Sequence, residues 1–365
     1  MLIVLIVSLI FAVTDSHALW QNVKGRPLVV LATPQGPRDP YYGPFYEDII
    51  KFQINYAKKI MGKDNVIIIA AEGLAYNRLK CELPGHVLEG TIDDIWMRDL
   101  GGAIQKEPIL FRYAPQYIKS RRQQRRIRQS FLDVLKSYGV NKNDFVSSEL
   151  ILDGGNVVDN AVDTLVATTR IYDDNINFGN PRDIRAQLAE ETEYDNIVVI
   201  DEIEGDATGH SDGMVSFIDT RTLALSDLGD QSTNMRYKNS LRRQLPQDID
   251  IIMIPNRYKD EIWRGFTSAC GLHINALTTT NYVYVPTFGH DRANVRDGRN
   301  YNTAYDNEVI DVIERHTTKT VVPVPVDYKI CRMGGSVRCL SWQVEGRIAD
   351  NLVDAAQRLA AREKC

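Results

Sequence analysis

The sequence lacks the short motifs that mark several common kinds of functional site. It has no CxxC pair, no HExxH helix, no phosphate-binding glycine loop, no GxSxG elbow and no dinucleotide fingerprint. Its six histidines are scattered, with none at the spacing of metal ligands, so we expect neither a metal nor another cofactor. The 365 residues carry a net charge of −5, which argues against a general nucleic-acid-binding protein.

Long apolar runs are missing everywhere except at the N-terminus. Residues 2–13 form an apolar run broken only by Ser8, and Ser16-His17-Ala18 follows as a small-x-small site. This pattern predicts a signal peptide over residues 1–18 and a secreted mature protein with no membrane span. No Lys or Arg precedes the apolar run, so a signal anchor is the alternative interpretation.

The remainder, residues 19–365, alternates strand and helix patterns without a break in composition. This predicts one domain of the α/β class, with α+β as the alternative. The predicted helices cover 46–60, 121–138, 232–244, 305–315 and 346–362, and the predicted strands cover 27–33, 65–71, 195–201, 214–219, 249–254, 281–286 and 320–326. The Pro- and Gly-rich segment 34–44 is a predicted loop that could form a wall of a site.

One predicted helix carries a dense basic cluster. Six cations lie between Lys119 and Arg128, and Ile127, Phe131 and Leu132 are left to face inward. We interpret this cluster as a solvated helix face, with an acidic partner as the alternative.

Five polar segments recur along the chain at nearly equal spacing. The steps from Asp99 to Asp153, His210, Asn275 and Cys339 are 54, 57, 65 and 64 residues, and glycines or other small residues accompany each segment. Such a period predicts a repeated β-rich unit arranged around an axis, with each copy delivering one polar element to a common centre.

The first and third of these segments contain carboxylates in distinctive surroundings. Asp99 follows Trp96, and a carboxylate beside a large aromatic ring suits a planar cation, although an Asp–Arg pair or a helix cap is the bland alternative. His210 and Asp212 would point to one face of a strand, which fits a general acid/base with a raised pKa as well as it fits a structural pair.

The last segment contains the candidate nucleophile. Cys339 follows Gly334-Gly335 and lies next to Arg338, a cation that could lower the pKa of the thiol. A buried, inert cysteine is the alternative.

Taken together, WMRDLGG, DGGN, GHSDGMVSF and GGSVRC, in this order, resemble the motifs of the guanidine-modifying (pentein) superfamily. The resemblance is closest to the agmatine deiminase and bacterial-type peptidylarginine deiminase family, and it runs from about residue 26 to 362. It implies a five-bladed, pseudo-symmetric α/β propeller.

The resemblance also implies a role for each matching residue. It makes Cys339 the nucleophile, His210 the acid/base, and Asp99 and Asp212 the carboxylates that bind a guanidinium group. It adds further residues to the substrate site, which are Trp96, Asp153 (one methylene shorter than the usual Glu), Asn275 and Arg338.

The implied activity is a deiminase reaction through a covalent thiouronium intermediate, without a cofactor. The predicted secretory route favours arginine in a peptide or protein as the substrate, with agmatine or free arginine as alternatives. Three departures from the family pattern leave an inactive guanidinium-binding protein as an alternative function. They are Arg338 for the usual His, RDLGG for RDxGP and MGGS for a GGGN-like turn. A secreted cysteine hydrolase of peptide bonds is the weakest alternative. The oligomeric state is open.

The five cysteines can then be divided. If the resemblance makes Cys339 a free thiol, the even set Cys81, Cys270, Cys331 and Cys365 remains and allows two disulfides in three possible connectivities. A bridge at Cys331 would brace the loop that carries Cys339.

Overall fold

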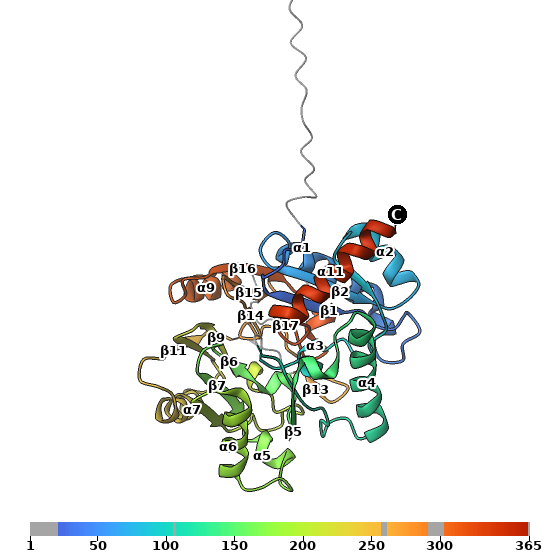
Figure 1. The fold of residues 1–365 in the computed structure, drawn as a ribbon. Helices are drawn as coiled ribbons and strands as arrows, with labels where there is room; N and C mark the ends of the chain where they lie inside the picture. The colour runs from blue at the N-terminus through green and yellow to red at the C-terminus, as the bar shows by residue number, and fades with distance from the viewer. Residues whose placement is uncertain (1–20, 105–106, 257–260, 291–302, 364–365) are drawn as a thin grey trace, which may run out of the picture.

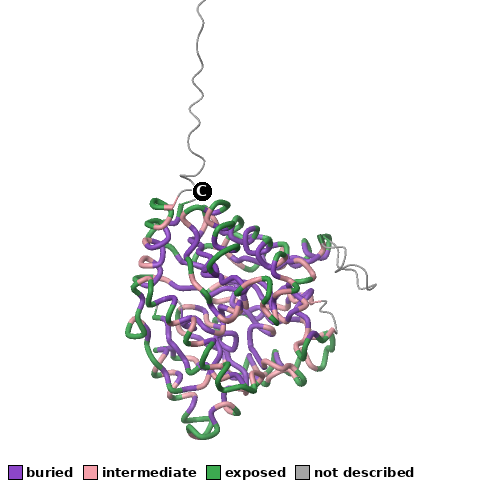
Figure 2. The backbone as a smooth tube through the Cα atoms, turned by 90° about the vertical axis from the view of Figure 1, so that its right-hand side faces the viewer, coloured by how far each residue is buried: buried purple, intermediate pink, exposed green. Residues whose placement is uncertain are grey.

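The computed structural model describes residues 21–104, 107–256, 261–290 and 303–363 (Figure 1). The predicted signal peptide over residues 1–18 and the predicted pairing of Cys365 lie outside these ranges. Buried backbone fills the interior and exposed backbone lies at the periphery (Figure 2). In the described ranges, no helix is both long enough and apolar enough to cross a membrane.

The fold is built from a repeated unit in which a helical segment joins two parallel strands. In the described part of the chain, the first sheet continues through a further helix to a third parallel strand, and five separate sheets are each built on one such unit. These five units are β1 (Leu28–Ala32), α1 (Tyr46–Ile60) and β2 (Asn65–Ala70); β4 (Ile109–Arg112), α4 (Arg121–Ser137) and β5 (Val146–Ile151); β7 (Thr164–Thr168), α5 (Arg170–Asp174), α6 (Pro181–Thr192) and β8 (Asn196–Ile200); β10 (Thr222–Ser226), α7 (Gln231–Gln244) and β11 (Asp250–Ile254); and β15 (Tyr282–Thr287), α9 (Thr303–Glu314) and β16 (Thr320–Pro325).

Four of these parallel pairs carry an antiparallel strand on one edge. The added strands are β17 (Trp342–Val344) on β1, β6 (Val158–Asp159) on β7, β9 (Val215–Asp219) on β10 and β14 (Leu277–Thr278) on β15. These units confirm the predicted α/β class. No sheet closes on itself within the described ranges, so the five-bladed propeller stays a prediction.

The remaining elements connect the units. The first unit continues through α2 (Leu74–Glu82) to a fourth strand, β3 (Val87–Glu89), and the hairpin of β12 (Ile262–Trp263) and β13 (Phe266–Thr267) precedes the last unit. The short helices are α3 (Met97–Leu100), α10 (Tyr328–Cys331) and the 3₁₀ turns η2 (Gly43–Phe45), η3 (Lys142–Asp144), η4 (Gly154–Asn156) and η5 (Ser211–Gly213), and α11 (Gly346–Arg362) ends the described chain.

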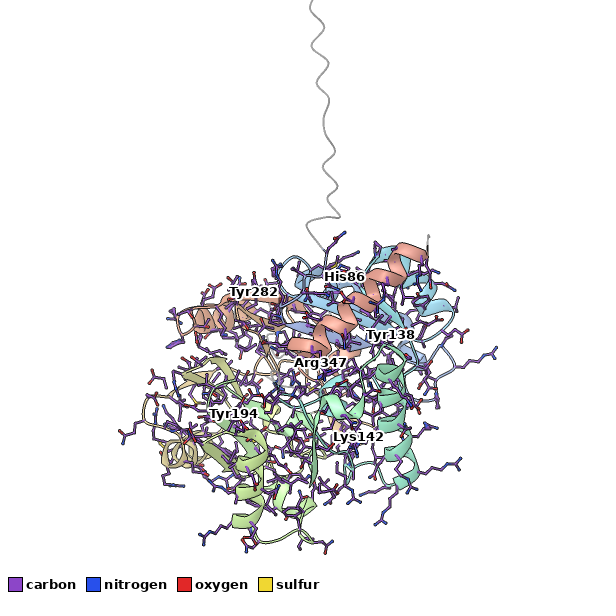
Figure 3. The ribbon with its side chains drawn as sticks, viewed as in Figure 1. His86, Tyr138, Lys142, Tyr194, Tyr282 and Arg347 are labelled. Atoms are coloured by element: carbon purple, nitrogen blue, oxygen red, sulfur yellow. A yellow bond between two sulfur atoms is a disulfide. The ribbon has the colours of Figure 1, made fainter. Side chains whose placement is uncertain are left out.

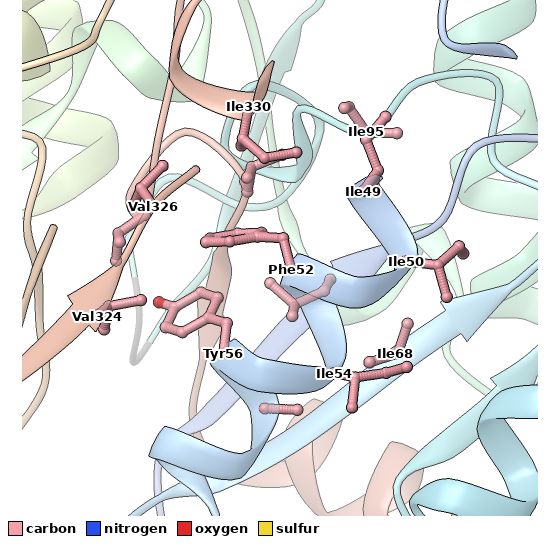
Figure 4. Packing of buried hydrophobic residues seen from close by; sticks show 14 of the residues in the cluster. Ile49, Ile50, Phe52, Ile54, Tyr56, Ile68, Ile95, Val324, Val326 and Ile330 are labelled. Carbon is pink, nitrogen blue, oxygen red and sulfur yellow. The ribbon is translucent and has the colours of Figure 1, made fainter. Parts of the chain in front are cut away.

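The first and last units share one hydrophobic core. All six residues of β2 are buried because helices cover both faces of its sheet, which explains the unbroken apolar run NVIIIA. Phe52 and Tyr56 on the buried face of α1 pack beside Val324 of β16 and Val326 just after it (Figure 4). In addition, β17, near the C-terminal end of the described chain, pairs antiparallel with β1, near its N-terminal end.

Tyrosine hydroxyl groups form hydrogen bonds both between neighbouring units and within one sheet, and Figure 3 labels two of these residues, Tyr138 and Tyr194. The hydroxyl of Tyr138, which follows α4, donates a hydrogen bond to the carbonyl of Glu89 in β3 at 2.6 Å. The hydroxyl of Tyr194, which precedes β8, donates to Asp159 Oδ1 in β6 at 3.2 Å.

The five predicted helices and seven predicted strands are all present, with ends within two residues of those expected. The sequence analysis missed α6, whose start is marked by Asn180 as the N-cap, Pro181 and a capping box with Asp183. It also missed α2, which buries only Ala75, Tyr76 and Leu79 and therefore has a weak apolar period.

The basic cluster lies on a helix, as predicted. In α4, Ile127 and Phe131 are buried, whereas Leu132 is only partly buried. Arg126 forms an ion pair with Asp93 at 2.6 Å, and most of the other cations of the cluster are exposed.

The described cysteines divide as predicted into paired and free residues. Cys270 and Cys331 form a disulfide, Cys81 is also disulfide-bonded, and Cys339 is a free thiol. The Cys270–Cys331 bridge joins the segment after the β12–β13 hairpin to α10, which leads into the loop that carries Cys339.

Replacing both Cys270 and Cys331 with serine is expected to destabilise the protein. The bridge closes a loop with a sequence separation of 61 residues. Its loss lowers the free energy of unfolding by about 4 kcal/mol, because the unfolded chain gains conformational freedom. Denaturant unfolding of the variant and its parent under non-oxidising and non-reducing conditions measures this difference. Equal stability of the two proteins would show that the bridge carries no such constraint.

Candidate active site

The structure explains the near-equal spacing of the five polar residues. Each one lies in a connection between the last parallel strand of one unit and the strand that follows in the next unit or on its edge; for Asn275 this connection includes the β12–β13 hairpin. Asp99 follows β3 on α3, Asp153 follows β5, His210 follows β8, Asn275 follows β11, and Cys339 follows β16 and α10. The repeated unit therefore delivers these residues at regular intervals along the chain.

His210 lies between two carboxylates and under a tyrosine. Its Nε2 is 3.4 Å from Asp153 Oδ2, and its Nδ1 is 3.9 Å from Asp99 Oδ1. The hydroxyl of Tyr117 lies 3.4 Å from both Asp99 Oδ2 and Asp153 Oδ2, and its ring packs edge-on against His210. His210 and Asp212 do not lie on a strand as expected, because Asp212 belongs to the 3₁₀ turn η5 and His210 immediately precedes it.

These carboxylates change the proton affinity of the histidine. Burial disfavours the imidazolium, but Asp99, then Asp153 and then Asp212 outweigh it and raise the pKa of His210 to about 10. The predicted direction of the shift is therefore correct, although its main source is not Asp212. Burial, opposed by His210, raises the pKa of Asp99 to about 7.

The stability of the protein is expected to fall between about pH 6.5 and pH 10 through His210. The folded state holds the imidazole proton up to about pH 10, whereas the unfolded state loses it near 6.5. The stabilisation is complete below pH 6.5 and falls by up to about 1.4 kcal/mol per pH unit above it. Denaturant unfolding at several pH values measures the slope, which we expect to flatten in His210→Gln.

The exposed His316→Gln serves as the matched control for this experiment, because it removes a histidine far along the chain from the polar segments. An unchanged slope in His210→Gln would contradict the proposed proton linkage.

The thiol of Cys339 contacts an amide and a carboxylate. Asn275 Nδ2 donates to the sulfur at 3.1 Å, and the sulfur lies 3.8 Å from Asp212 Oδ2. Asn275 Oδ1 accepts hydrogen bonds from the backbone N–H groups of Ser336 and Cys339 and from the Ser336 hydroxyl, at 3.0 to 3.3 Å. Asn275 thus fixes the loop that carries the nucleophile and also reaches its sulfur.

The effect of Arg338 differs from the sequence-based expectation. Its Nη2 donates to the carbonyl of Val157 at 2.8 Å, and its Nη1 lies 3.7 Å from Asp212 Oδ2. Burial, and then the carboxylates of Asp212 and Asp99, raise the pKa of Cys339 well above its ordinary value. Arg338 is next to Cys339 in the sequence, but the expected lowering of the Cys339 pKa does not occur, because the guanidinium of Arg338 extends toward Val157. The predicted contact of Arg338 with a substrate stays a prediction.

The acidic part of the site, around Asp99 and His210, packs closely against the loop that carries Cys339, and glycines allow this close approach. The backbone N–H of Arg98 donates to the carbonyl of Cys339 at 3.2 Å, which places α3 against the nucleophile loop. A Cβ atom at Gly335 would collide with the ring of Trp96 and with Cys339. Trp96 therefore packs directly beside the nucleophile, as its predicted role requires.

Three further residues support the site and were not among the residues predicted for it. Tyr117 and Phe266 pack edge-on at a centroid distance of 5.6 Å, which brings the β12–β13 hairpin over the acidic side of the site. Asn156 Oδ1 accepts from the N–H groups of Thr168 and Ser211, at 2.8 and 3.2 Å, and so holds η4 against η5. Asn156 is the last residue of the DGGN motif, whereas Tyr117 in a loop and Phe266 in β13 belong to no motif.

The structure thus brings together the predicted residues Cys339, His210, Asp99, Asp212, Asp153, Asn275 and Trp96, whereas the guanidinium of Arg338 extends toward Val157. This arrangement contains the chemical groups that a guanidinium would need. Asp99 and Asp212 supply carboxylates, His210 holds a proton, and Cys339 supplies the thiol. Within the described ranges, no three His, Cys, Asp or Glu side chains are placed to hold a metal ion.

Comparison with known proteins places this fold among the deiminases that act on guanidino compounds. The profile of the Porphyromonas-type peptidyl-arginine deiminase family matches residues 25–344. The chain belongs to this family. A search of curated proteins found no match.

Solved structures of the same fold include three deiminases. Agmatine deiminase from C. jejuni, solved with substrate bound, has a TM-score of 0.69 at 16% identity, and the match covers 89% of this chain and 96% of that one. Agmatine deiminase from Enterococcus faecalis has a TM-score of 0.66 at 14% identity, with 91% and 97% covered. A Porphyromonas gingivalis protein provisionally assigned as an arginine deiminase has a TM-score of 0.64 at 17% identity, with 89% and 97% covered. At these identities the likeness establishes the fold alone.

Proposed function

We propose that this protein hydrolyses the guanidinium group of arginine residues in peptides or proteins, giving a ureido product and ammonia. The observation that carries the proposal is the convergence of a free thiol, an imidazole with a raised pKa and two carboxylates in one buried site. These groups come from three separate connections of the fold, which carry Asp99, the pair of His210 and Asp212, and Cys339.

In the proposed reaction, Asp99 and Asp212 bind the nitrogens of the guanidinium and hold its central carbon near the sulfur of Cys339. Burial, together with the carboxylates of Asp212 and Asp99, raises the pKa of the Cys339 thiol in the free protein. A bound guanidinium cation would offset those charges, and its arrival therefore favours the thiolate.

The thiolate then attacks the central carbon and forms a tetrahedral adduct. Collapse of the adduct breaks one C–N bond, and the departing nitrogen takes a proton from His210 to leave as ammonia. With a pKa of about 10, His210 carries this proton at neutral pH. The resulting thiouronium is attacked by water, which gives a proton to the now neutral His210, and cleavage of the C–S bond returns the thiol and releases the ureido product.

The choice of peptidyl-arginine rests on the predicted signal peptide, since a secreted enzyme meets peptides and proteins, and on the description of the family. Agmatine and free arginine are the alternative substrates, and an inactive guanidinium-binding protein is the alternative function. We further propose that the five units form the blades of a propeller, which would place their five polar connections around one axis.

A single assay separates these possibilities. Ammonia and the ureido product are measured in parallel with an arginine-containing peptide, free arginine and agmatine. We expect the highest kcat/KM with the peptide. A preference for agmatine or free arginine would reassign the substrate, and the absence of product from all three would favour the binding function.

A further inference from the structure

A small buried cavity lies behind the candidate active site. It leaves about 20 Å³ for the centre of a water-sized sphere. Its walls come from α3, from the edge strands β6, β9, β14 and β17, and from the nucleophile loop. The same connections that carry the polar residues of the active site therefore enclose this second space.

Two guanidinium groups face the cavity, and both are buried. Arg98 and Arg338 are 4% and 7% exposed. Arg98 Nε and Arg338 Nη1 are buried and have no hydrogen-bond partner among the described residues, and the same holds for the hydroxyl of Thr278, which also lines the cavity. Buried N–H groups of charged side chains are costly when they remain unpartnered, so the cavity is built to receive an acceptor.

The charges around the cavity indicate the kind of acceptor. Asp159 is the carboxylate in its wall, and its Oδ1 already accepts from the backbone of Ala161 and from Tyr194. Asp212 lies 3.7 Å from Arg338 but also faces the thiol of Cys339. Asp159 and Asp212 both offset the charges of the two guanidinium groups, but neither accepts a hydrogen bond from Arg98 Nε or Arg338 Nη1.

The size of the cavity limits the ligand to a single small species. A water molecule needs about 10 to 15 Å³ by the same measure, so the space fits one atom of slightly greater radius and excludes sulfate or phosphate. We propose that the cavity binds one monatomic halide, of the size of chloride, between Arg98, Arg338 and Thr278. Burial and the nearby Arg338 lower the pKa of Arg98 to about 9. A bound anion would stabilise the charged form of Arg98 and so oppose this shift.

The proposal does not rest on the proposed deiminase activity, and its test needs no turnover. The melting temperature of the full chain is measured in sodium chloride and in sodium gluconate at equal ionic strength. We expect chloride to raise it by about 2 °C, because an ion that binds only the native state stabilises it. A crystal soaked in bromide is expected to show an anomalous peak inside the cavity.

Two variants and one control locate the effect. Arg338→His removes one guanidinium, and Thr278→Val removes the hydroxyl with little change of volume, so each is expected to lose most of the chloride shift. The exposed Arg122→His is expected to keep it. If Arg338→His does not fold, Thr278→Val decides. Equal melting temperatures in the two salts and a cavity without a bromide peak would overturn the proposal and assign the space to water.

Discussion

Replacing Cys339 with alanine is expected to abolish ammonia release while the protein remains folded. The thiol supplies the bond-forming electron pair in the proposed reaction, and without it the guanidinium resists attack by water. We expect kcat to fall at least about 10⁴-fold, to the detection limit of an ammonia assay. Unchanged turnover would exclude the proposed nucleophile.

The same variant separates chemistry from binding. Cys339 contacts the amide of Asn275 and the carboxylate of Asp212, and its removal leaves the two carboxylates that would hold the substrate in place. We therefore expect Cys339→Ala to bind an arginine-containing peptide, measured by calorimetry, with a circular dichroism spectrum equal to that of the parent. Loss of both binding and folded structure would show that the variant reports on stability and not on catalysis.

The second large effect is expected from Gly155→Ala. An added Cβ atom would meet Nδ1 of His210 and lie 2.9 Å from Asp99 Oδ1, while the Gly155 N–H donates to that carboxylate at 3.1 Å. One methyl group would therefore separate the imidazole from the carboxylate of Asp99. We expect kcat/KM to fall at least about 100-fold, because displacements near 1 Å cost that much in a catalytic site.

Gly213→Ala is the matched control for Gly155→Ala. Gly213 lies in η5, three residues after His210, but an added Cβ there meets only Leu272 Cδ2 at 3.8 Å, an ordinary contact. We expect this variant to keep most of the parent activity in the same assay. If both alanine variants were equally active, the close packing around His210 would not be required for the reaction.

Local patterns predicted much of the secondary structure because burial imposes them directly. The run NVIIIA became β2 because both faces of its sheet are covered, and the apolar spacing of residues 46–60 became α1 because one face packs on a core. Helix α2 was missed for the converse reason, since it buries few residues and leaves a weak pattern.

The polar residues of the site were also found in the sequence, because the repeated unit spaces them regularly and the family motifs surround them. The contacts among these residues could not be found in the sequence. Asp212 was the expected partner of His210 from its position two residues later, whereas Asp153 and Asp99, distant in sequence, lie at 3.4 and 3.9 Å. Tyr117 joins these carboxylates from a loop that has no motif at all.

Local burial and residue type were thus enough to predict the α/β class, the repeated unit, the family resemblance and the identity of the reactive groups. The three-dimensional arrangement was needed for the direction of the Cys339 pKa shift, the turn of Arg338 toward Val157 and the cavity that it shares with Arg98. The physical reason is that electrostatic and steric effects act through space over a few ångströms, and neighbours in space come from connections more than fifty residues apart.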